Sequence, residues 1–298
     1  MIYNKTKKSR TKKTRTKKTT TKKLINNINK TINVLSYNIS WESMTGKVSD
    51  WKLCSNNSDK KHSKHYSVCV NNIANVINDY KKTNNNNTNT NYETLDFITL
   101  QEATDFYKLI EQSPTLKKMK YEIHKSGLDN MVTFWKPKYK LLYTIKGEFE
   151  KGRPWLATLF NSNKSNKSST HSILCVINVH MGHYNKNEEY LKLEKMIFSI
   201  KEDIKKNKTH KLNINTIRYI ISGDFNYNIK KFGNSQHKII INGTPFYHHP
   251  KHILTCCINR NTHFDHVIDS LNKPFDIQIP YVNYMASDHK PIIVKLVL

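Results

Sequence analysis

The sequence contains no run of apolar residues long enough to cross a bilayer. A transmembrane helix needs about 20 predominantly apolar residues, and no segment of the 298-residue chain approaches that length. The first residues also lack the apolar segment of a secretory signal peptide. With 37% hydrophobic residues the chain can still fill a core. We therefore expect a soluble, intracellular globular protein, in either the nucleus or the cytoplasm.

Cysteine is scarce, and its spacing indicates no metal or disulfide site. The five cysteines include no C-x-x-C pair, which is the spacing typical of zinc ligands. Cys256 and Cys257 are neighbours, which is poor geometry for an ordinary disulfide. An odd number of cysteines without a framework is typical of a reducing compartment. We expect neither a zinc site nor a disulfide framework.

Arginine and acidic residues are both few beside lysine. Only five of the 49 basic residues are arginine, against 23 acidic residues, and the formal net charge is +26. Such a charge favours a nucleic-acid partner, because lysines beside phosphates release condensed counterions. AT-rich coding sequence, which the excess of lysine, asparagine and isoleucine also indicates, would make a chain basic without any such partner. Both causes stay open at this point.

The basic charge is densest near the N-terminus. Residues 5–23, KTKKSRTKKTRTKKTTTKK, hold eleven basic residues and no acidic one. This segment has no apolar residue to bury and repels itself. We therefore expect a disordered basic tail over residues 1–30 and one folded domain over residues 31–298. The tail could be a nuclear address, a nucleic-acid tether or a solubilising extension.

Short β-type runs alternate with helical stretches along the rest of the chain. Apolar spacing predicts helices over Val68–Tyr80 and Glu188–Lys205. Low-complexity segments at 81–91 and 161–170, and histidine-rich stretches at 61–66 and 247–252, are expected to be loops. The pattern indicates an α/β or α+β domain in which helices cover sheets. The predicted strands are Ile32–Tyr37, Asp96–Leu100, Met131–Trp135, Trp155–Phe160, Ile173–Val179, Tyr219–Ser222, Phe264–Ser270 and Ile292–Val297.

Polar side chains recur where these predicted strands meet loops. Taken singly, each of them also fits a turn or a surface position. Together they are notable, because a rigid sheet can aim side chains from several strand ends into one cleft. They are Asn38, Glu102, His180, Asp224, Asn226, Asp265, Asp288 and His289.

These residue types suit hydrolysis of a phosphate ester. Glu102, Asp288 and Asn38 offer the oxygen ligands that Mg²⁺ prefers. The reaction needs a metal on a phosphate oxygen, a carboxylate to orient or deprotonate water, and a donor for the charge on phosphate. Asp224, Asn226 and a pair of histidines cover the remaining tasks.

Six motifs, in order between Ile32 and the C-terminus, make the sequence resemble the endonuclease/exonuclease/phosphatase superfamily with the deoxyribonuclease I-like fold. They are VLSYNIS, ITLQEAT, NVHMG, ISGDFNYN, FDHVIDS and ASDHKPIIV. The resemblance implies a four-layered sandwich, in which two mixed β-sheets lie face to face with helices outside. It also implies a monomeric hydrolase that acts on phosphate ester bonds and depends on Mg²⁺ or Mn²⁺.

The resemblance assigns roles on the metal side residue by residue. Glu102 resembles the main metal ligand of the family, with Asn38 and Asp288 nearby. Asp224 resembles the carboxylate that orients water, and Asn226 resembles a contact to phosphate or to metal-bound water. Abasic-site endonucleases have a second acid two residues beyond the asparagine. Here that position is a serine, so ligation from this strand depends on Asn38.

On the phosphate side, the resemblance involves two histidines. His289 resembles the acid/base histidine oriented by Asp265, and His180 resembles a second donor. Arg153, in GRPWLATLF, is a candidate to bind phosphate. His180 stands where abasic-site endonucleases have tyrosine. This favours the two-histidine branch that includes deoxyribonuclease I, the sphingomyelinases and the tyrosyl-DNA phosphodiesterases.

The sequence leaves the substrate open. Net charge favours a phosphodiester in nucleic acid, so that the chain would be a nuclease or a DNA-end phosphodiesterase. A phospholipid or phosphoinositide phosphoesterase of the same fold is the alternative, although the inositol-phosphatase signature Trp-Cys-Asp-Arg is absent. A catalytically silent nucleic-acid-binding protein is the third hypothesis.

Overall fold

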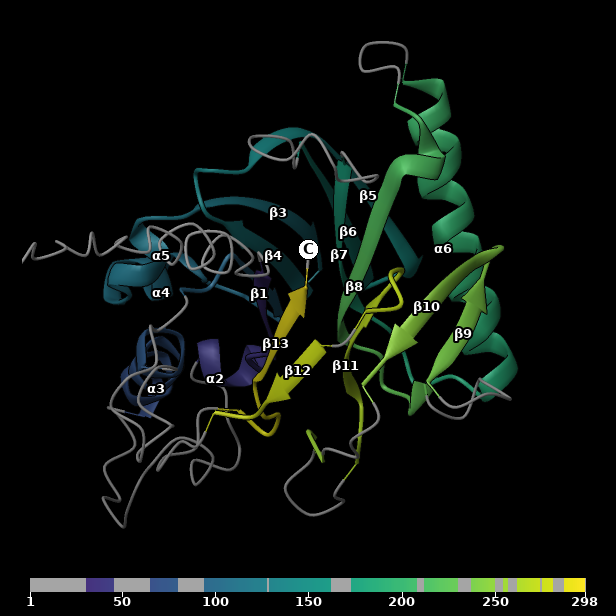
Figure 1. Cartoon of the computed structure of the whole chain (residues 1–298). Coiled ribbons are helices and arrows are strands. Elements are labelled where there is room, and N and C mark those ends of the chain that lie inside the picture. The colour runs from purple at the N-terminus through teal and green to yellow at the C-terminus, as the bar shows by residue number, and fades with distance from the viewer. Residues whose placement is uncertain are drawn as a thin grey trace, which may run out of the picture.

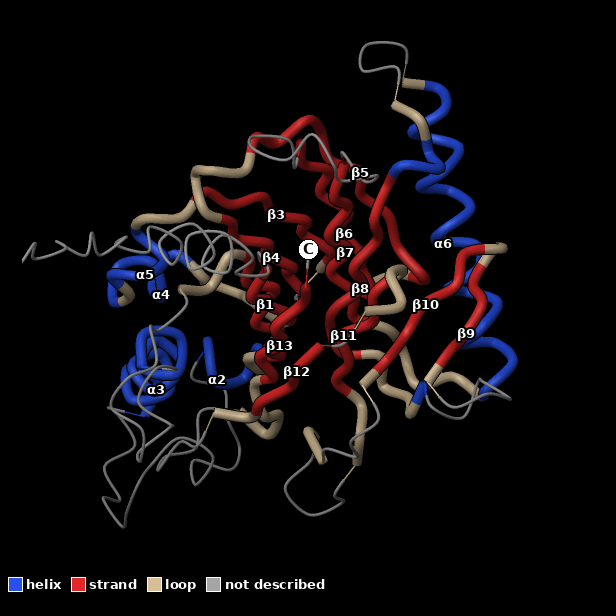
Figure 2. The backbone as a smooth tube through the Cα atoms, in the orientation of Figure 1, coloured by secondary structure: helices blue, strands red, loops and turns tan. Residues whose placement is uncertain are grey.

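The chain folds into two β-sheets packed face to face (Figures 1 and 2). The computed structural model describes residues 31–45, 65–79, 94–127, 129–161, 173–207, 212–229, 237–249, 254–256, 262–273, 275–280 and 287–297. The predicted basic tail over residues 1–30 therefore lies outside the described residues. Among the residues that are described, no helix is both long and apolar enough to cross a membrane.

The first sheet has six strands in the order β12-β13-β1-β2-β4-β3. Its β1 and β2 are parallel, while the other neighbouring strands are antiparallel. Asn38 at the end of β1 therefore lies beside Gln101 at the end of β2. The strands are β1 (Thr31–Asn38), β2 (Phe97–Gln101), β3 (Lys120–Ser126), β4 (Asp129–Trp135), β12 (Phe275–Gln278) and β13 (Ile292–Val297).

The second sheet has seven strands in the order β5-β6-β7-β8-β11-β10-β9. Its β7 and β8 are parallel, so that His180 and Asp224 lie side by side at their carboxyl ends. Asp265, the first residue of antiparallel β11, pairs with Asp224 from the other side. The strands are β5 (Lys140–Glu150), β6 (Arg153–Asn161), β7 (Ile173–His180), β8 (Ile217–Asp224), β9 (Lys238–Ile241), β10 (Thr244–His248) and β11 (Asp265–Asp269).

Helices cover both outer faces, giving four layers. In Figure 1 the helices α3, α4 and α5 lie on one side of the pair of sheets, and α6 lies on the other. One apolar cluster joins α3 to the first sheet, a second joins α6 to the second sheet, and a third fills the space between the sheets. The helices are α2 (Trp41–Thr45), α3 (His65–Asp79), α4 (Tyr107–Gln112), α5 (Pro114–Lys117) and α6 (Lys186–Lys206), with a 3-10 turn at Ile214–Thr216. The predicted four-layered α/β sandwich is confirmed.

The central strands are apolar along most of their length because both of their faces are covered. Every residue of β7 (ILCVINVH) and of β8 (IRYIISGD) is buried, as expected for strands enclosed between a second sheet and a helix. Polar side chains also cross between the sheets. Gln101 donates to Asn178 over 2.7 Å, and Thr99 and Ser222 share a hydrogen bond of 3.0 Å. These contacts fix how the two sheets align near the ends of β2 and β7.

Two smaller expectations are wrong. Cys69 and Cys256 are each disulfide-bonded, to partners outside the described residues, whereas we expected no disulfide framework. Cysteine pairing cannot be deduced from sequence spacing. The histidine-rich stretches are also not simply loops. His65 lies in α3, and Tyr247 and His248 end β10, where His248 is buried.

Candidate functional site

The site forms where central strands of both sheets end and the chain turns sharply. Three non-glycine residues just beyond these strand ends have left-handed backbone conformations: Ser40 (φ 59°), Glu102 (φ 54°) and Asn226 (φ 51°). Such conformations are uncommon for residues other than glycine and cluster at functional sites. Gly223 (φ 149°) precedes Asp224, and a Cβ atom there would collide with the carbonyl group of Val179. Only glycine lets β8 approach β7 this closely.

Asn38 connects the two sheets at the centre of the site. Its side-chain nitrogen donates to Oε1 of Glu102 and to Oδ2 of Asp224, both over 3.0 Å. Its side-chain oxygen accepts the backbone N–H of Ser40 over 3.0 Å. In this arrangement Asn38 therefore presents its nitrogen to the two carboxylates, because the Ser40 N–H occupies its oxygen.

Asp129, at the start of β4, is a site residue that the sequence analysis missed. Its Oδ1 accepts the backbone N–H of Glu102 over 3.1 Å, and its Oδ2 lies 2.5 Å from Nδ1 of His180. One carboxylate therefore holds both the backbone of Glu102 and the ring of His180. The signal that could have found it is an acid at the start of β4. Because β4 runs antiparallel to β2, the amino end of β4 lies beside the carboxyl end of β2.

His180 lies among three carboxylates and one guanidinium. Burial disfavours its charged form, but Asp129, Asp224 and Glu102 raise its pKa above the usual value. Nη1 of Arg153, the first residue of β6, lies 2.7 Å from Nε2 of His180. A guanidinium has only donors, so this contact requires Nε2 to accept and assigns the ring proton to Nδ1. The carboxylates thus favour a charged His180 ring, whereas the contact with Arg153 favours a neutral one.

Asp265, the first residue of β11, and His289, which precedes β13, form a buried pair. Oδ2 of Asp265 lies 2.9 Å from Nδ1 of His289. Burial raises the pKa of Asp265 to about 6 despite the neighbouring imidazole. For His289, burial alone would lower the pKa. The charges of Asp265 and Asp224 outweigh this effect and raise the pKa of His289 well above the usual value. Near pH 7 the pair is therefore an imidazolium beside a carboxylate, with Nε2 of His289 directed toward Asp224.

Asp224 lies between the two histidines. Its Oδ2 is 3.6 Å from Nε2 of His180 and 3.6 Å from Nε2 of His289. Its Oδ1 accepts the backbone N–H of Asn226 over 2.8 Å, while the side chain of Asn226 donates to the carbonyl of Met181 over 2.7 Å. Asp224 is 1% exposed. Its carboxylate is thus held rigidly and surrounded by donors.

Asp288 lies in the short segment that precedes β13. It is half-buried, and its neighbour Ser287 donates to the carbonyl of Asn38 over 2.8 Å, which ties this loop to the end of β1. The Asp288 carboxylate also lies within 4.8 Å of the nearest ring nitrogen of His289. Side-chain contacts thus join the other eight predicted site residues. Asp288 lies beside them because it directly precedes His289 in the sequence.

Comparison with known proteins supports the fold and not a particular activity. No protein-family model and no curated protein matches the sequence. Solved structures do match. Truncated Caenorhabditis elegans TDP2 is 14% identical, with a TM-score of 0.56, over 90% of this chain and 98% of that one. An endonuclease/exonuclease/phosphatase family protein from Bacteroides thetaiotaomicron is 15% identical, with a TM-score of 0.52, over 90% and 98%.

A third structural match is a phosphatase. A mannosyl-6-phosphatase of Bacteroides thetaiotaomicron is 15% identical, with a TM-score of 0.51, over 90% of this chain and all of that one. The chain therefore has the fold that these three proteins share. The two-histidine branch stays a prediction.

Proposed function

We propose that the chain is a metal-dependent phosphoesterase that hydrolyses a phosphodiester, with nucleic acid as the favoured substrate class. One observation carries the proposal: the buried carboxylate of Asp224 lies 3.6 Å from a ring nitrogen of His180 and of His289. A base beside a charged His289 that can donate to a phosphate suits attack by water, and His180 would become a second donor once Arg153 leaves its Nε2. A turn-forming aspartate would need neither histidine.

The acidic side of the site suits a hard divalent cation. Glu102 and Asp288 supply carboxylate oxygens, and Asp288 is accessible enough to meet an ion together with its waters. We propose that these two residues and Asn38 hold Mg²⁺ or Mn²⁺. Asn38 can offer its oxygen only after its amide turns away from the Ser40 N–H. When bound, the ion would supply positive charge to a phosphate oxygen.

Asp224 is proposed to orient and deprotonate the attacking water. Donors from Asn38 and from the backbone of Asn226 fix its carboxylate in place. Because both oxygens are already bound by protein groups, Asp224 cannot rotate away from the water that it holds. Asn226, anchored to Met181, sets this geometry and can contact the phosphate or a water on the ion.

His289 is proposed to donate a proton or a hydrogen bond from Nε2 to the phosphate or the leaving oxygen. Asp265 fixes the other ring nitrogen and favours the charged ring. On the opposite side, Arg153 and His180 can serve one phosphate together only if the guanidinium moves from Nε2 of His180 to that phosphate. Asp129 keeps His180 oriented during this exchange.

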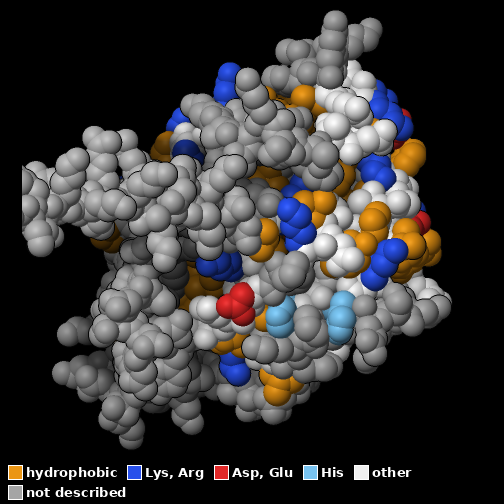
Figure 3. Space-filling model, viewed as in Figure 1, with side chains coloured by type: hydrophobic (Ala, Val, Ile, Leu, Met, Phe, Trp, Pro, Cys, Tyr) orange, Lys and Arg blue, Asp and Glu red, His pale blue; other side chains and the backbone are white. Residues whose placement is uncertain are grey.

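Net charge supports nucleic acid as the substrate. The chain carries a formal +26, and lysine and arginine side chains are scattered over the face seen in Figure 3, where acidic side chains are few. A phosphate ester of another kind is the alternative, and the mannosyl-6-phosphatase of the same fold supports keeping it in the test. A silent nucleic-acid-binding protein would have no physical need for two oriented histidines around Asp224.

A substrate panel tests the proposal. The purified full chain is incubated with plasmid DNA, oligonucleotides, RNA, sphingomyelin, phosphoinositides and mannose 6-phosphate, each with Mg²⁺, Mn²⁺ or EDTA. We expect hydrolysis of a nucleic acid that needs the ion. Turnover of only a lipid or only a sugar phosphate would show that the substrate is not a nucleic acid. If no ester is hydrolysed with either ion, the enzyme hypothesis gives way to the binding protein.

A further inference from the structure

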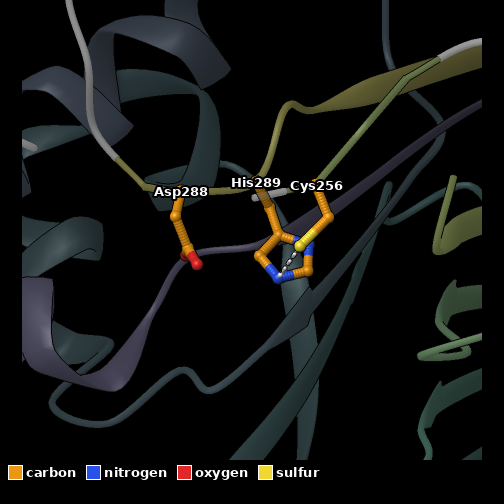
Figure 4. A group of neighbouring side chains, drawn as sticks. All are labelled: Cys256, Asp288 and His289. Carbon is orange, nitrogen blue, oxygen red and sulfur yellow. Dashed lines mark hydrogen bonds between the residues drawn. The ribbon is translucent and has the colours of Figure 1, made fainter. Parts of the chain in front are cut away.

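A sulfur atom lies against the catalytic candidate His289. Sγ of Cys256 is 3.2 Å from Nε2 of His289, the nitrogen that does not face Asp265. A carboxylate oxygen of Asp288 completes a group whose ligand atoms all lie within 4.8 Å of one another. Figure 4 shows the Cys256 sulfur over the His289 ring, with the Asp288 carboxylate on the other side of that ring. The proposed mechanism makes no use of this sulfur.

Backbone pairing fixes the position of Cys256. It forms bridges to both Thr262 and His289. The adjacent Thr255 accepts the backbone N–H of Lys290 at its carbonyl, and its hydroxyl accepts the N–H of Asp265 over 3.0 Å. The segment that carries the sulfur is thus hydrogen-bonded to Asp265 and to Lys290, the residue after His289. Cys256 is 6% exposed, so its side chain has little room to turn elsewhere.

We propose that, once Cys256 is reduced, Cys256, Asp288 and His289 form a Zn²⁺ site that inhibits the enzyme. Thiolate, imidazole and carboxylate are the three ligand types of zinc sites that keep a fourth position for water. Mg²⁺ prefers oxygen ligands and gains little from sulfur or nitrogen. The two ions would therefore bind at different places. Mg²⁺ would bind where Asp288 offers oxygen ligands, and Zn²⁺ would bind where Cys256 also offers sulfur.

The oxidation state of Cys256 controls this site. Cys256 is disulfide-bonded in the structure, and a disulfide sulfur lacks the thiolate charge that binds zinc. A dithiol reductant transfers two electrons and two protons to the disulfide, which gives two thiols and an oxidised, cyclic reductant. Zn²⁺ then binds the Cys256 sulfur and Nε2 of His289, and one proton leaves each of them to solvent. Only the reduced protein is expected to bind Zn²⁺ here.

Inhibition follows from the ligands that Zn²⁺ would occupy. A bound ion takes the lone pair of Nε2, so that His289 can no longer donate to a phosphate. It also competes for Asp288, which the proposed function assigns to Mg²⁺. This part of the inference rests on the proposed function, whereas the metal site itself does not.

Cobalt spectroscopy tests the site without any substrate. Co²⁺ replaces Zn²⁺ in the dithiol-treated full chain, and a thiolate ligand gives a near-ultraviolet sulfur-to-cobalt absorption band. We expect the band in reduced wild type, its loss on adding Zn²⁺, and no band in the oxidised protein. Cys256→Ser should abolish it, while the matched control Cys175→Ala, at a buried free cysteine of β7, should retain it. If reduced wild type gives no band, or Cys256→Ser gives an equal one, the site is refuted.

Two further variants keep the test decisive. If Cys256→Ser does not fold, as judged by thermal unfolding, Cys256→Ala takes its place. Asp288→Asn should retain the band but bind Co²⁺ at least about tenfold more weakly, since it loses one charged ligand. Where turnover is measurable, Zn²⁺ should inhibit the reduced wild type at least about tenfold more strongly than the oxidised protein or Cys256→Ser. Equal inhibition would contradict the inhibitory role, even if the band confirms the site.

Discussion

The carboxylate of Asp129 lies 2.5 Å from Nδ1 of His180, and this contact joins the first sheet to the second at the candidate site. The other oxygen of Asp129 holds the backbone N–H of Glu102. A single acid at the start of β4 therefore orients a histidine and positions the loop that carries a proposed metal ligand.

Replacing Asp129 should impair catalysis more than stability. In Asp129→Asn one oxygen remains for the Glu102 N–H, but the charge that orients His180 is lost. We expect kcat to fall by about 10²-fold, the lower range for general acid–base contributions, with only a small change in melting temperature. Asp105→Asn is the matched control, because Asp105 is exposed and forms a surface ion pair with Lys108. Equal rates for the two variants would show that Asp129 has no role in orienting His180.

Glu102→Gln tests the metal assignment. The substitution keeps the shape of the side chain and its ability to accept the Trp41 N–H, but it removes the negative charge that attracts the ion. We expect weaker Mg²⁺ affinity, seen as a higher Mg²⁺ concentration for half-maximal rate, together with a lower maximal rate. A metal titration identical to that of wild type would mean that the ion binds elsewhere.

Asp224 and His289 should act in one step, because their side chains approach within 3.6 Å. We expect Asp224→Asn and His289→Ala each to lower kcat by at least about 10²-fold. The double variant should lose much less than the product of the single losses, since residues that act as a unit are not additive. Multiplicative losses would instead indicate independent roles.

Glu189 gives a pH-dependent prediction for stability. This residue of α6 is fully buried, and its carboxyl oxygens have no hydrogen-bond partner among the residues that the structure describes. Burial, and secondly the charge of Asp224, raises its pKa from 4.5 to about 9. The folded protein therefore keeps a proton that the unfolded chain releases above pH 4.5, so the free energy of unfolding falls as the pH rises toward 9.

Glu189→Gln should remove that dependence. At pH 7 the variant should be more stable than wild type by roughly 1–3 kcal/mol, and near pH 4.5 the difference should vanish. Denaturant unfolding at several pH values measures this. Glu111→Gln, at an exposed position of α4, serves as the control and should show no such trend. A variant less stable than wild type at pH 8 would show that Glu189 is ionised and stabilising in the fold.

The sequence predicted the central elements better than the edges. Strands such as β7 and β8 are buried throughout, so that their apolar runs were readable. The strands β3, β5, β9, β10 and β12 were not predicted. In β5, KLLYTIKGEFE, exposed lysine and glutamate alternate with half-buried residues, which weakens the apolar signal at the edge of the sheet.

The candidate site shows the same contrast. Residues that follow a strand, such as Glu102 and Asp224, could be collected from the sequence because strand ends are visible there. Asp129 is instead the first residue of its strand, and its role depends on β4 running antiparallel to β2, which spacing alone does not reveal. The contact between Cys256 and His289 joins positions 33 residues apart and could be found only in the structure.

The most direct test of the account is hydrolysis of a chromogenic aryl phosphodiester by wild type and by Asp224→Asn. Such a substrate reports phosphodiester cleavage without recognition of a base, a lipid or a sugar. We predict turnover by wild type that EDTA abolishes and added Mg²⁺ or Mn²⁺ restores, and a rate at least about 10²-fold lower for Asp224→Asn under the same conditions. Turnover that persists in EDTA, or an Asp224→Asn variant as active as wild type, would contradict the account.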